Sequence, residues 1–181
     1  LVASYVDEAL IEAVAHEHRK GRRLLVATTN LDSQETVIWD LGAIAAAGGP
    51  EATSRFRDVL VASASLPGVF PAKLIKTWRG QTPIVEAHID GGVAAPFFTS
   101  SEGLTDWVSP NARPDNPGRL FAIINGKTTP NFAFAHTGAV SVLSRSLNVM
   151  GKAQLRSQLA LSRRWAVNNH SRFAYAEIGR A

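Results

Sequence analysis

Short apolar runs that alternate with helix-like segments constrain the fold of this chain more than any other feature of its sequence. Residues 24–27 form a continuous apolar run. Such a run suits a strand that is buried on both faces, as in a parallel sheet. Further strands are predicted at 36–41, 84–89, 120–124 and 172–178, and helices at about 4–20, 54–65 and 137–166. Strands that alternate with helices predict an α/β layer fold.

The two ends of the sequence affect how much of a domain we expect it to represent. The chain opens on Leu1 at the start of a helix, which Ser4 and Asp7 begin with an S-x-x-D capping pattern. The last predicted strand stops close to Ala181. Because strands need neighbours, we expect residues 1–181 to be the C-terminal portion of a single, longer domain.

Composition excludes several classes of site. A length of 181 residues suits one domain, and the absence of cysteine excludes disulfides, zinc–thiolate sites and cysteine nucleophiles. No apolar run reaches the ~18 residues of a membrane span, and no signal peptide is visible. Residues 141–181 hold seven basic and one acidic side chain. This basic tail indicates an anionic surface as a partner.

The segment Asp90-Gly91-Gly92 is the most informative motif. The strand predicted at 84–89 delivers a carboxylate to its carboxyl end, where open α/β sheets bind ligands. The two glycines allow a positive φ and a close backbone approach. The alternative interpretation is a tight turn with Asp90 as turn former. A proline-rich loop predicted at 93–118 follows, and loops of this length often form lids or binding walls.

A second motif of small residues ends the helix predicted at 54–65. It continues into a turn braced by Pro67, and small residues let another element approach closely. Simple packing of helix on sheet explains the same pattern. Ser63 or Ser65 would serve as a nucleophile only with a base beside it, and neither lies in a G-x-S-x-G elbow.

A metal site is a further interpretation. His88 and Asp90 share one face of their strand, and His136 or His170 would be a third ligand. The same spacing fits a strand histidine that faces a packed layer, which is the interpretation we favour. No metal and no cofactor is predicted.

The late helix has two faces of different character. One stripe is apolar and holds Leu143, Leu147, Met150, Leu161 and Trp165. The opposite stripe is basic and holds Arg145, Lys152, Arg156 and Arg163. A basic stripe fits either a solvated surface or attraction to anionic lipid head groups. Nucleic acid is not predicted, because the bases sit on one helix and no aromatic side chains interleave with them.

Taken in order, three segments resemble the patatin-like phospholipase family: residues 24–30, residues 62–71 and residues 90–93. The resemblance covers about residues 20–100. It implies a three-layer α/β/α sandwich with a mostly parallel central sheet, and a lipid acyl hydrolase that uses a Ser–Asp dyad. The dyad aspartate would be Asp90, and the substrate an acyl lipid.

The nucleophile that this resemblance implies lies in a G-x-S-x-G segment, and residues 1–181 contain none. We therefore expect the full-length protein to hydrolyse acyl esters and residues 1–181 alone to be inactive. Two other functions stay open: a non-catalytic lipid-binding or scaffold module of the same fold, and a metallohydrolase built on His88 and Asp90.

Overall fold

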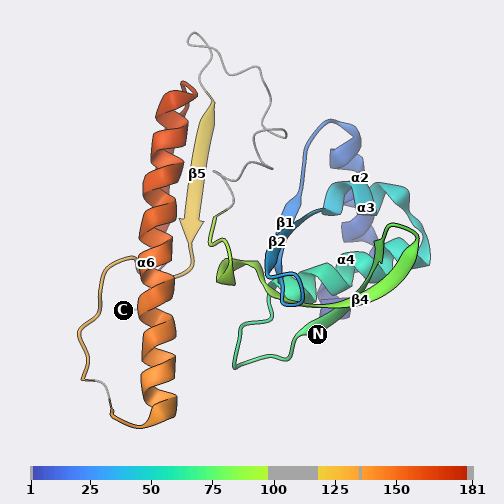
Figure 1. Cartoon of the computed structure of the whole chain (residues 1–181). Coiled ribbons are helices and arrows are strands. Elements are labelled where there is room, and N and C mark those ends of the chain that lie inside the picture. The colour runs from blue at the N-terminus through green and yellow to red at the C-terminus, as the bar shows by residue number, and fades with distance from the viewer. Residues whose placement is uncertain (1, 98–117, 135, 179–181) are drawn as a thin grey trace. The chain divides into compact units, whose positions relative to one another are not determined.

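The computed structural model describes residues 2–97, 118–134 and 136–178. The chain divides into two compact units, Leu1–Ala95 and Pro96–Ala181. Each unit is described by itself (Figure 1). Most of the loop predicted at 93–118 lies outside the described residues.

The first unit combines helices with one four-stranded sheet. Its elements in chain order are α1 (Val2–Tyr5), α2 (Glu8–Arg19), β1 (Leu25–Asn30), β2 (Glu35–Asp40), α3 (Leu41–Ala47), α4 (Gly49–Ser63), β3 (Lys73–Arg79), β4 (Thr82–Asp90) and the 3₁₀ helix η1 (Gly91–Val93). The predicted mixture of helices and strands is therefore confirmed.

The sheet is antiparallel throughout, so the prediction of a mostly parallel sheet is wrong for this unit. Its strand order is β2-β1-β4-β3, and all three strand pairs are antiparallel. The physical reason is the length of the connections. Residues 31–34 join β1 to β2, and Gly80 and Gln81 join β3 to β4. A parallel pair needs a crossover of about a dozen residues or more, whereas short turns make hairpins.

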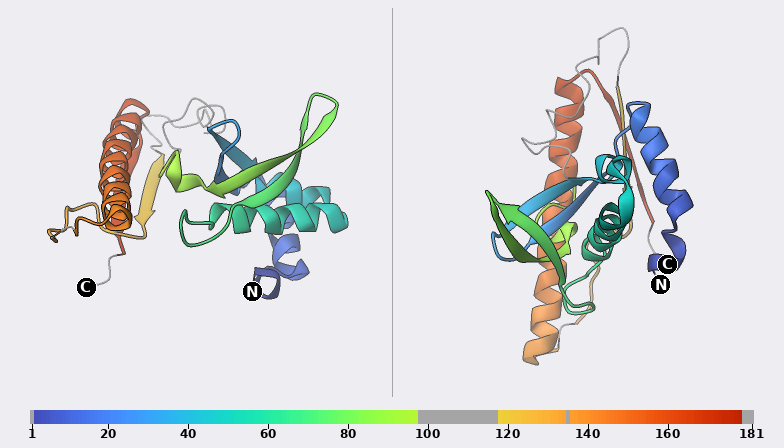
Figure 2. Two further views of the ribbon diagram at one scale, coloured as in Figure 1. Left: turned by 60° about the horizontal axis from the view of Figure 1, so that its bottom comes forward. Right: turned by 90° about the vertical axis from the view of Figure 1, so that its right-hand side faces the viewer.

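Strand β3 has no counterpart among the predicted strands, although the sequence carries a signal for it. Lys73 to Arg79 is followed by a two-residue turn in which Gly80 has φ +62°. Glycine at positive φ between two β-rich runs is typical of a tight hairpin. The β3–β4 hairpin is the green, twisted ribbon in Figure 2.

Helix α2 begins three residues later than the capping pattern predicted. Asp7, not Ser4, is the N-cap, because its Oδ1 accepts a hydrogen bond from Leu10 N at 2.8 Å. The preceding short helix α1 ends at Tyr5, so the chain needs a break before α2 can start. The last turn of α2 is basic, with His16, His18 and Arg19, and Lys20 is the C-cap.

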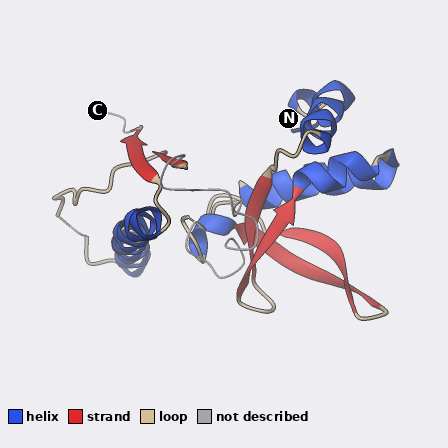
Figure 3. Cartoon of the chain, turned by 90° about the horizontal axis from the view of Figure 1, so that it is seen from above, coloured by secondary structure: helices blue, strands red, loops and turns tan. Residues whose placement is uncertain are grey.

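The core of the first unit lies between the helices and one face of the sheet. Phe56 and Val59 of α4 pack with Leu41 of α3, Ile11 of α2 and Ile75 of β3. In Figure 3 these helices lie together on one side of the sheet. The opposite face of the β3–β4 hairpin exposes Leu74, Trp78 and Val85. The described first unit thus has two layers, one of helices and one of strands.

The second unit contains β5 (Arg119–Ile124), α6 (Ala139–Asn168) and β6 (Arg172–Glu177). Strands β5 and β6 pair in parallel, and the long helix α6 connects them. This β-α-β unit is the one described part of the chain where the predicted parallel pairing holds. The basic stripe of α6 is not a free surface, because Arg145, Lys152 and Arg156 donate hydrogen bonds to backbone carbonyls of residues 128–131.

Among the described helices, none combines the length and the apolar character that crossing a membrane requires.

Candidate functional site around Asp90

Asp90 is the last residue of β4, and its side chain caps the turn that follows. Its Oδ1 accepts a hydrogen bond from Gly92 N at 2.7 Å, at the start of η1. Its side chain is half-buried. Within the described residues, no hydrogen bond or ion pair reaches the other oxygen, Oδ2. Asp90 is therefore a turn former, as one interpretation predicted, and it also keeps one carboxylate oxygen available for chemistry.

Gly91 brings β4 and β1 into unusually close contact. A Cβ atom at position 91 would lie 2.4 Å from the Ala27 carbonyl oxygen and 2.6 Å from the Ala27 carbonyl carbon. Both atoms belong to the backbone and cannot move aside. The predicted close approach is thus confirmed at Gly91. A positive φ plays no part, since neither Gly91 nor Gly92 adopts one.

Thr29 fastens the turn from both sides. Its Oγ1 donates to the Asp90 carbonyl oxygen at 2.9 Å and accepts from Ala94 N at 3.2 Å. The side chain is buried at the end of β1. In the sequence, Thr29 belongs to the family-like segment 24–30, and no role was predicted for it. The sequence signal for this role is a hydroxyl residue at the end of a buried strand, in a chain that also contains an Asp-Gly-Gly turn.

The small-residue motif reaches Asp90 through backbone atoms. The Ser65 carbonyl oxygen accepts a hydrogen bond from Asp90 N at 3.1 Å. The Ser65 hydroxyl donates to the Val61 carbonyl oxygen at 2.8 Å and is buried. For Ser63, the last residue of α4, no side-chain hydrogen bond to an acid or imidazole exists among the described residues. Neither serine is therefore placed as a nucleophile for Asp90.

The turn after Ser65, whose carbonyl oxygen accepts from Asp90 N, exposes apolar side chains. Pro67 and Gly68 turn the chain, with φ +79° at Gly68, and Leu66, Val69 and Phe70 are exposed. Val93, which follows the Asp-Gly-Gly motif directly, is exposed as well. The two segments joined to Asp90, one through the Ser65 hydrogen bond and one along the chain, thus expose apolar side chains.

His88 lies two residues before Asp90 but belongs to the interior. It is fully buried, its Nδ1 lies 2.9 Å from Thr28 Oγ1, and its ring contacts Trp39 edge-on at 5.6 Å between centroids. Trp39 Nε1 donates to the same Thr28 oxygen at 2.8 Å. The Thr28 hydroxyl oxygen thus joins both aromatic side chains, and the direction of its hydrogen bond with His88 Nδ1 follows from the imidazole tautomer. In the described part of the chain Nε2 has no hydrogen-bond partner.

This environment confirms the interpretation of His88 as a histidine that faces a packed layer. Burial lowers its pKa from the usual 6.5, an effect that Glu86 and Asp32 partly oppose. The metal interpretation gains no support. No group of three or more histidine, cysteine, aspartate or glutamate side chains in the described ranges could hold a metal ion. His136 and His170 belong to the second unit.

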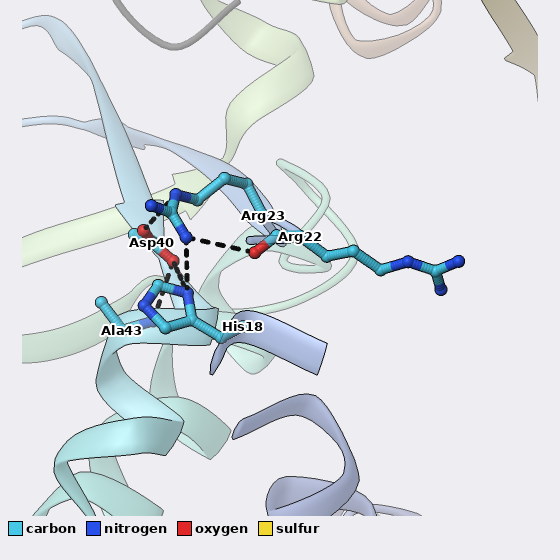
Figure 4. Close-up of polar contacts among 5 residues, drawn as sticks. All are labelled: His18, Arg22, Arg23, Asp40 and Ala43. Atoms are coloured by element: carbon cyan, nitrogen blue, oxygen red, sulfur yellow. Dashed lines mark hydrogen bonds and ion pairs between the residues drawn. The ribbon is translucent and has the colours of Figure 1, made fainter. Parts of the chain in front are cut away.

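A second histidine–carboxylate cluster joins α2 to α3 (Figure 4). His18 Nδ1 lies 3.7 Å from Asp40 Oδ1, and Arg23 Nε lies 3.8 Å from Asp40 Oδ2. Asp40 also caps α3 by accepting from Ala43 N at 2.8 Å. Arg22 points away from the cluster in Figure 4. The five residues drawn contain no hydroxyl or thiol, so the cluster fastens the helices and carries no nucleophile.

Replacing Gly91 by alanine tests the close approach. Gly91→Ala forces the new methyl group onto the Ala27 backbone. We expect a loss of about 1–3 kcal/mol in the free energy of unfolding, measured by urea denaturation. The matched control is Gly151→Ala inside α6, where a Cβ meets nothing within 4 Å. The control should gain up to about 1 kcal/mol from helix propensity. Equal urea midpoints for Gly91→Ala and the unmodified chain would contradict the description.

The buried imidazole predicts a pH dependence. Because burial lowers the His88 pKa below 6.5, the unfolded chain binds a proton more readily than the folded one. The stabilisation by neutral His88 is complete above about pH 6.5 and is lost as the pH falls below that value. His88→Gln, which cannot titrate, should lose less stability than the unmodified chain between pH 7.5 and pH 5.5. The other four histidines are present in both proteins, so identical losses would exclude His88 as a source.

A scan against protein-family models found no model that matches this chain, and a search of curated proteins found no match. The chemistry of the site therefore has to be argued from the residues and distances around Asp90.

Proposed function

We propose that Asp90 is the general base of a serine-type acyl hydrolase that acts on lipid esters. The observation that carries the proposal is the state of the Asp90 carboxylate. One oxygen is held by Gly92 N–H at 2.7 Å, and the other is free of partners among the described residues. A base needs this combination of fixed position and open lone pairs.

The surroundings hold the backbone of Asp90 in place and leave the second carboxylate oxygen without a hydrogen bond from the described residues. The Thr29 hydroxyl binds the Asp90 carbonyl oxygen, and the Ser65 carbonyl oxygen binds Asp90 N. Gly91 presses the same turn against Ala27. Catalytic groups work best when neighbouring residues lock their geometry before the substrate arrives.

The proposed reaction begins with a serine that lies outside residues 1–181. Its oxygen attacks the ester carbonyl carbon while its proton moves to Asp90 Oδ2. An aspartate is a weak base, with a pKa of ~3.9 in model peptides, so proton transfer must accompany attack. The tetrahedral intermediate collapses, the alcohol leaves with the proton from Asp90, and an acyl-enzyme remains. Water then attacks the acyl group, gives its proton through Asp90 to the serine, and releases the fatty acid.

The apolar turn supports a lipid as substrate. The Ser65 carbonyl oxygen accepts a hydrogen bond from Asp90 N. Leu66, Val69 and Phe70, which follow Ser65 in the chain, are exposed. Exposed apolar groups on a turn that is hydrogen-bonded to the Asp90 backbone would offer a surface for an acyl chain. Burying such a side chain against a ligand is worth up to about 1.5–3 kcal/mol.

A non-catalytic lipid-binding module is the second candidate. The observation that favours it is that no hydroxyl group of the described residues donates to the Asp90 carboxylate. The apolar turn would then bind lipid without turnover. The experiment below separates the two candidates, because only the first requires the Asp90 carboxylate to act as a base.

The test is Asp90→Asn in the full-length protein. Asparagine keeps the size of the side chain and can still accept from Gly92 N, so the fold should survive. The amide cannot take a proton, and kcat for an acyl ester should fall by about 10²–10⁴-fold with little change in KM. Asp58→Asn is the matched control, since it removes a carboxylate that pairs with Lys73 at 2.8 Å and lies outside the site. Its kcat should stay unchanged.

An Asp90→Asn variant with near-normal kcat and an unchanged melting temperature would exclude Asp90 as the base. A full-length protein that binds lipid vesicles but never turns over esters would instead favour the non-catalytic module.

A further inference from the structure

A segment of the second unit, residues 128–134, runs along α6 and is called the strap here. Three basic side chains of α6 hold its backbone. Arg156 Nη1 donates to the Thr128 carbonyl oxygen at 3.2 Å, Lys152 Nζ to that of Thr129 at 3.0 Å, and Arg145 Nη2 to that of Asn131 at 2.6 Å. Helix numbers fall as strap numbers rise, so the strap runs antiparallel to α6.

These contacts fix the strap without cancelling the charge beneath it. Carbonyl oxygens are neutral, so the three side chains keep their full positive charges. At 1.5 Å per residue, Arg145 and Arg156 are spaced about 16 Å along the helix axis. The strap is therefore a braced segment of backbone that lies over a row of cations.

The strap carries two phenylalanines that have almost no protein cover. Phe132 and Phe134 are 89% and 90% exposed. Their rings contact each other edge-to-face, with centroids 5.3 Å apart. At the end of the strap, Phe134 and Ala133 line an open groove together with Val140 and Arg145 of α6. Aromatic rings so exposed on a braced backbone point to a partner that offers apolar volume.

The positive charge of the second unit indicates which kind of partner would bind there. Residues 118–178 contain eight lysines and arginines and one acidic residue, Glu177. The Glu177 carboxylate accepts a hydrogen bond from the Thr128 hydroxyl, at the start of the strap. The partner must therefore combine an anionic surface with an apolar layer close beneath it.

We propose that the strap docks on an anionic lipid bilayer, with Phe132 and Phe134 in the interfacial layer and the basic row of α6 facing the head groups. Aromatic side chains favour that layer, and a basic row gains from the diffuse negative potential of the surface. The cationic ends of Arg145, Lys152 and Arg156 already bind carbonyl oxygens. They can still be attracted by the diffuse potential of the membrane surface, because this attraction needs no direct contact with a lipid. Nucleic acid fits less well, because its binding relies on direct contacts between free cations and phosphates.

The apolar stripe of α6 lies on the side of the helix opposite the basic row, so it is not part of the proposed docking surface. The inference stands on the second unit alone and does not depend on the role proposed for Asp90.

A single fluorescent label tests the proposal. The chain has no cysteine, so Ala133→Cys gives one attachment site, exposed between the two phenylalanines and leaving both in place. An environment-sensitive dye at this position, on the full chain, should brighten and shift to the blue with phosphatidylcholine vesicles that contain phosphatidylglycerol. The response should be much weaker with phosphatidylcholine alone and should fall at high salt.

Variants in the labelled background separate insertion from simple adsorption. The double change Phe132→Ser and Phe134→Ser should lower partitioning onto the anionic vesicles by about tenfold or more. Phe121→Ser is the matched control, because Phe121 is 69% exposed on β5 and lies outside the strap. It should leave partitioning unchanged.

Three outcomes would overturn the proposal: no response of the dye to anionic vesicles, equal responses to both kinds of vesicle at low salt, or equal losses from the double change and from Phe121→Ser. A dye response to single-stranded RNA without one to vesicles would also overturn it and would assign the surface to nucleic acid.

Discussion

The contact of Gly91 with the Ala27 backbone is the constraint on which the candidate site depends. It sets the separation of β4 from β1 at the point where β4 ends, and a side chain at position 91 would push them apart. Because the two strands meet this closely, the Thr29 hydroxyl reaches both the Asp90 carbonyl and Ala94 N. Asp90 therefore leaves the sheet in one defined direction, beside the end of α4.

Two ionisable side chains of β4, His88 and Asp90, differ in how deeply they are buried. His88 and Asp90 share a face of β4, but His88 lies under the helices beside Trp39, whereas Asp90 lies where the helical cover ends. Burial keeps the imidazole neutral by lowering its pKa, which makes His88 a structural group. Two residues further on, the carboxylate has one oxygen held and one available. Position along β4 thus decides which of the two side chains is fully buried.

Sequence reasoning located the elements better than their pairing. The apolar run at 24–27 marked β1, yet its continuous hydrophobicity suggested a parallel strand. Thr28, Thr29 and Asn30 are buried by contacts with the β4 end and the turn, which no local pattern reveals. The short turns that make the sheet antiparallel were visible in the sequence, and Gly80 was the clearest signal for the missed strand β3.

Part of the candidate site could also be predicted from the sequence, and part could not. Asp90 and the close approach at Gly91 could be predicted, because a carboxylate followed by two glycines after a strand has few uses. The roles of Thr29 and Ser65 could not, since both act across about 25 to 60 positions of sequence through backbone groups. The basic stripe of α6 was predicted correctly by spacing, but its contacts with the strap depend on the path of a segment without periodicity.

The central claim, that Asp90 activates a serine as its base, is tested most directly by the rate at which a fluorophosphonate modifies that serine. This reaction needs an activated hydroxyl but no bound lipid, so it isolates the proton transfer from substrate binding. In the full-length protein, Asp90→Asn should slow the modification by about 10²-fold or more, at an unchanged melting temperature. Modification of the Asp90→Asn protein at the rate of the unmodified protein would contradict the account.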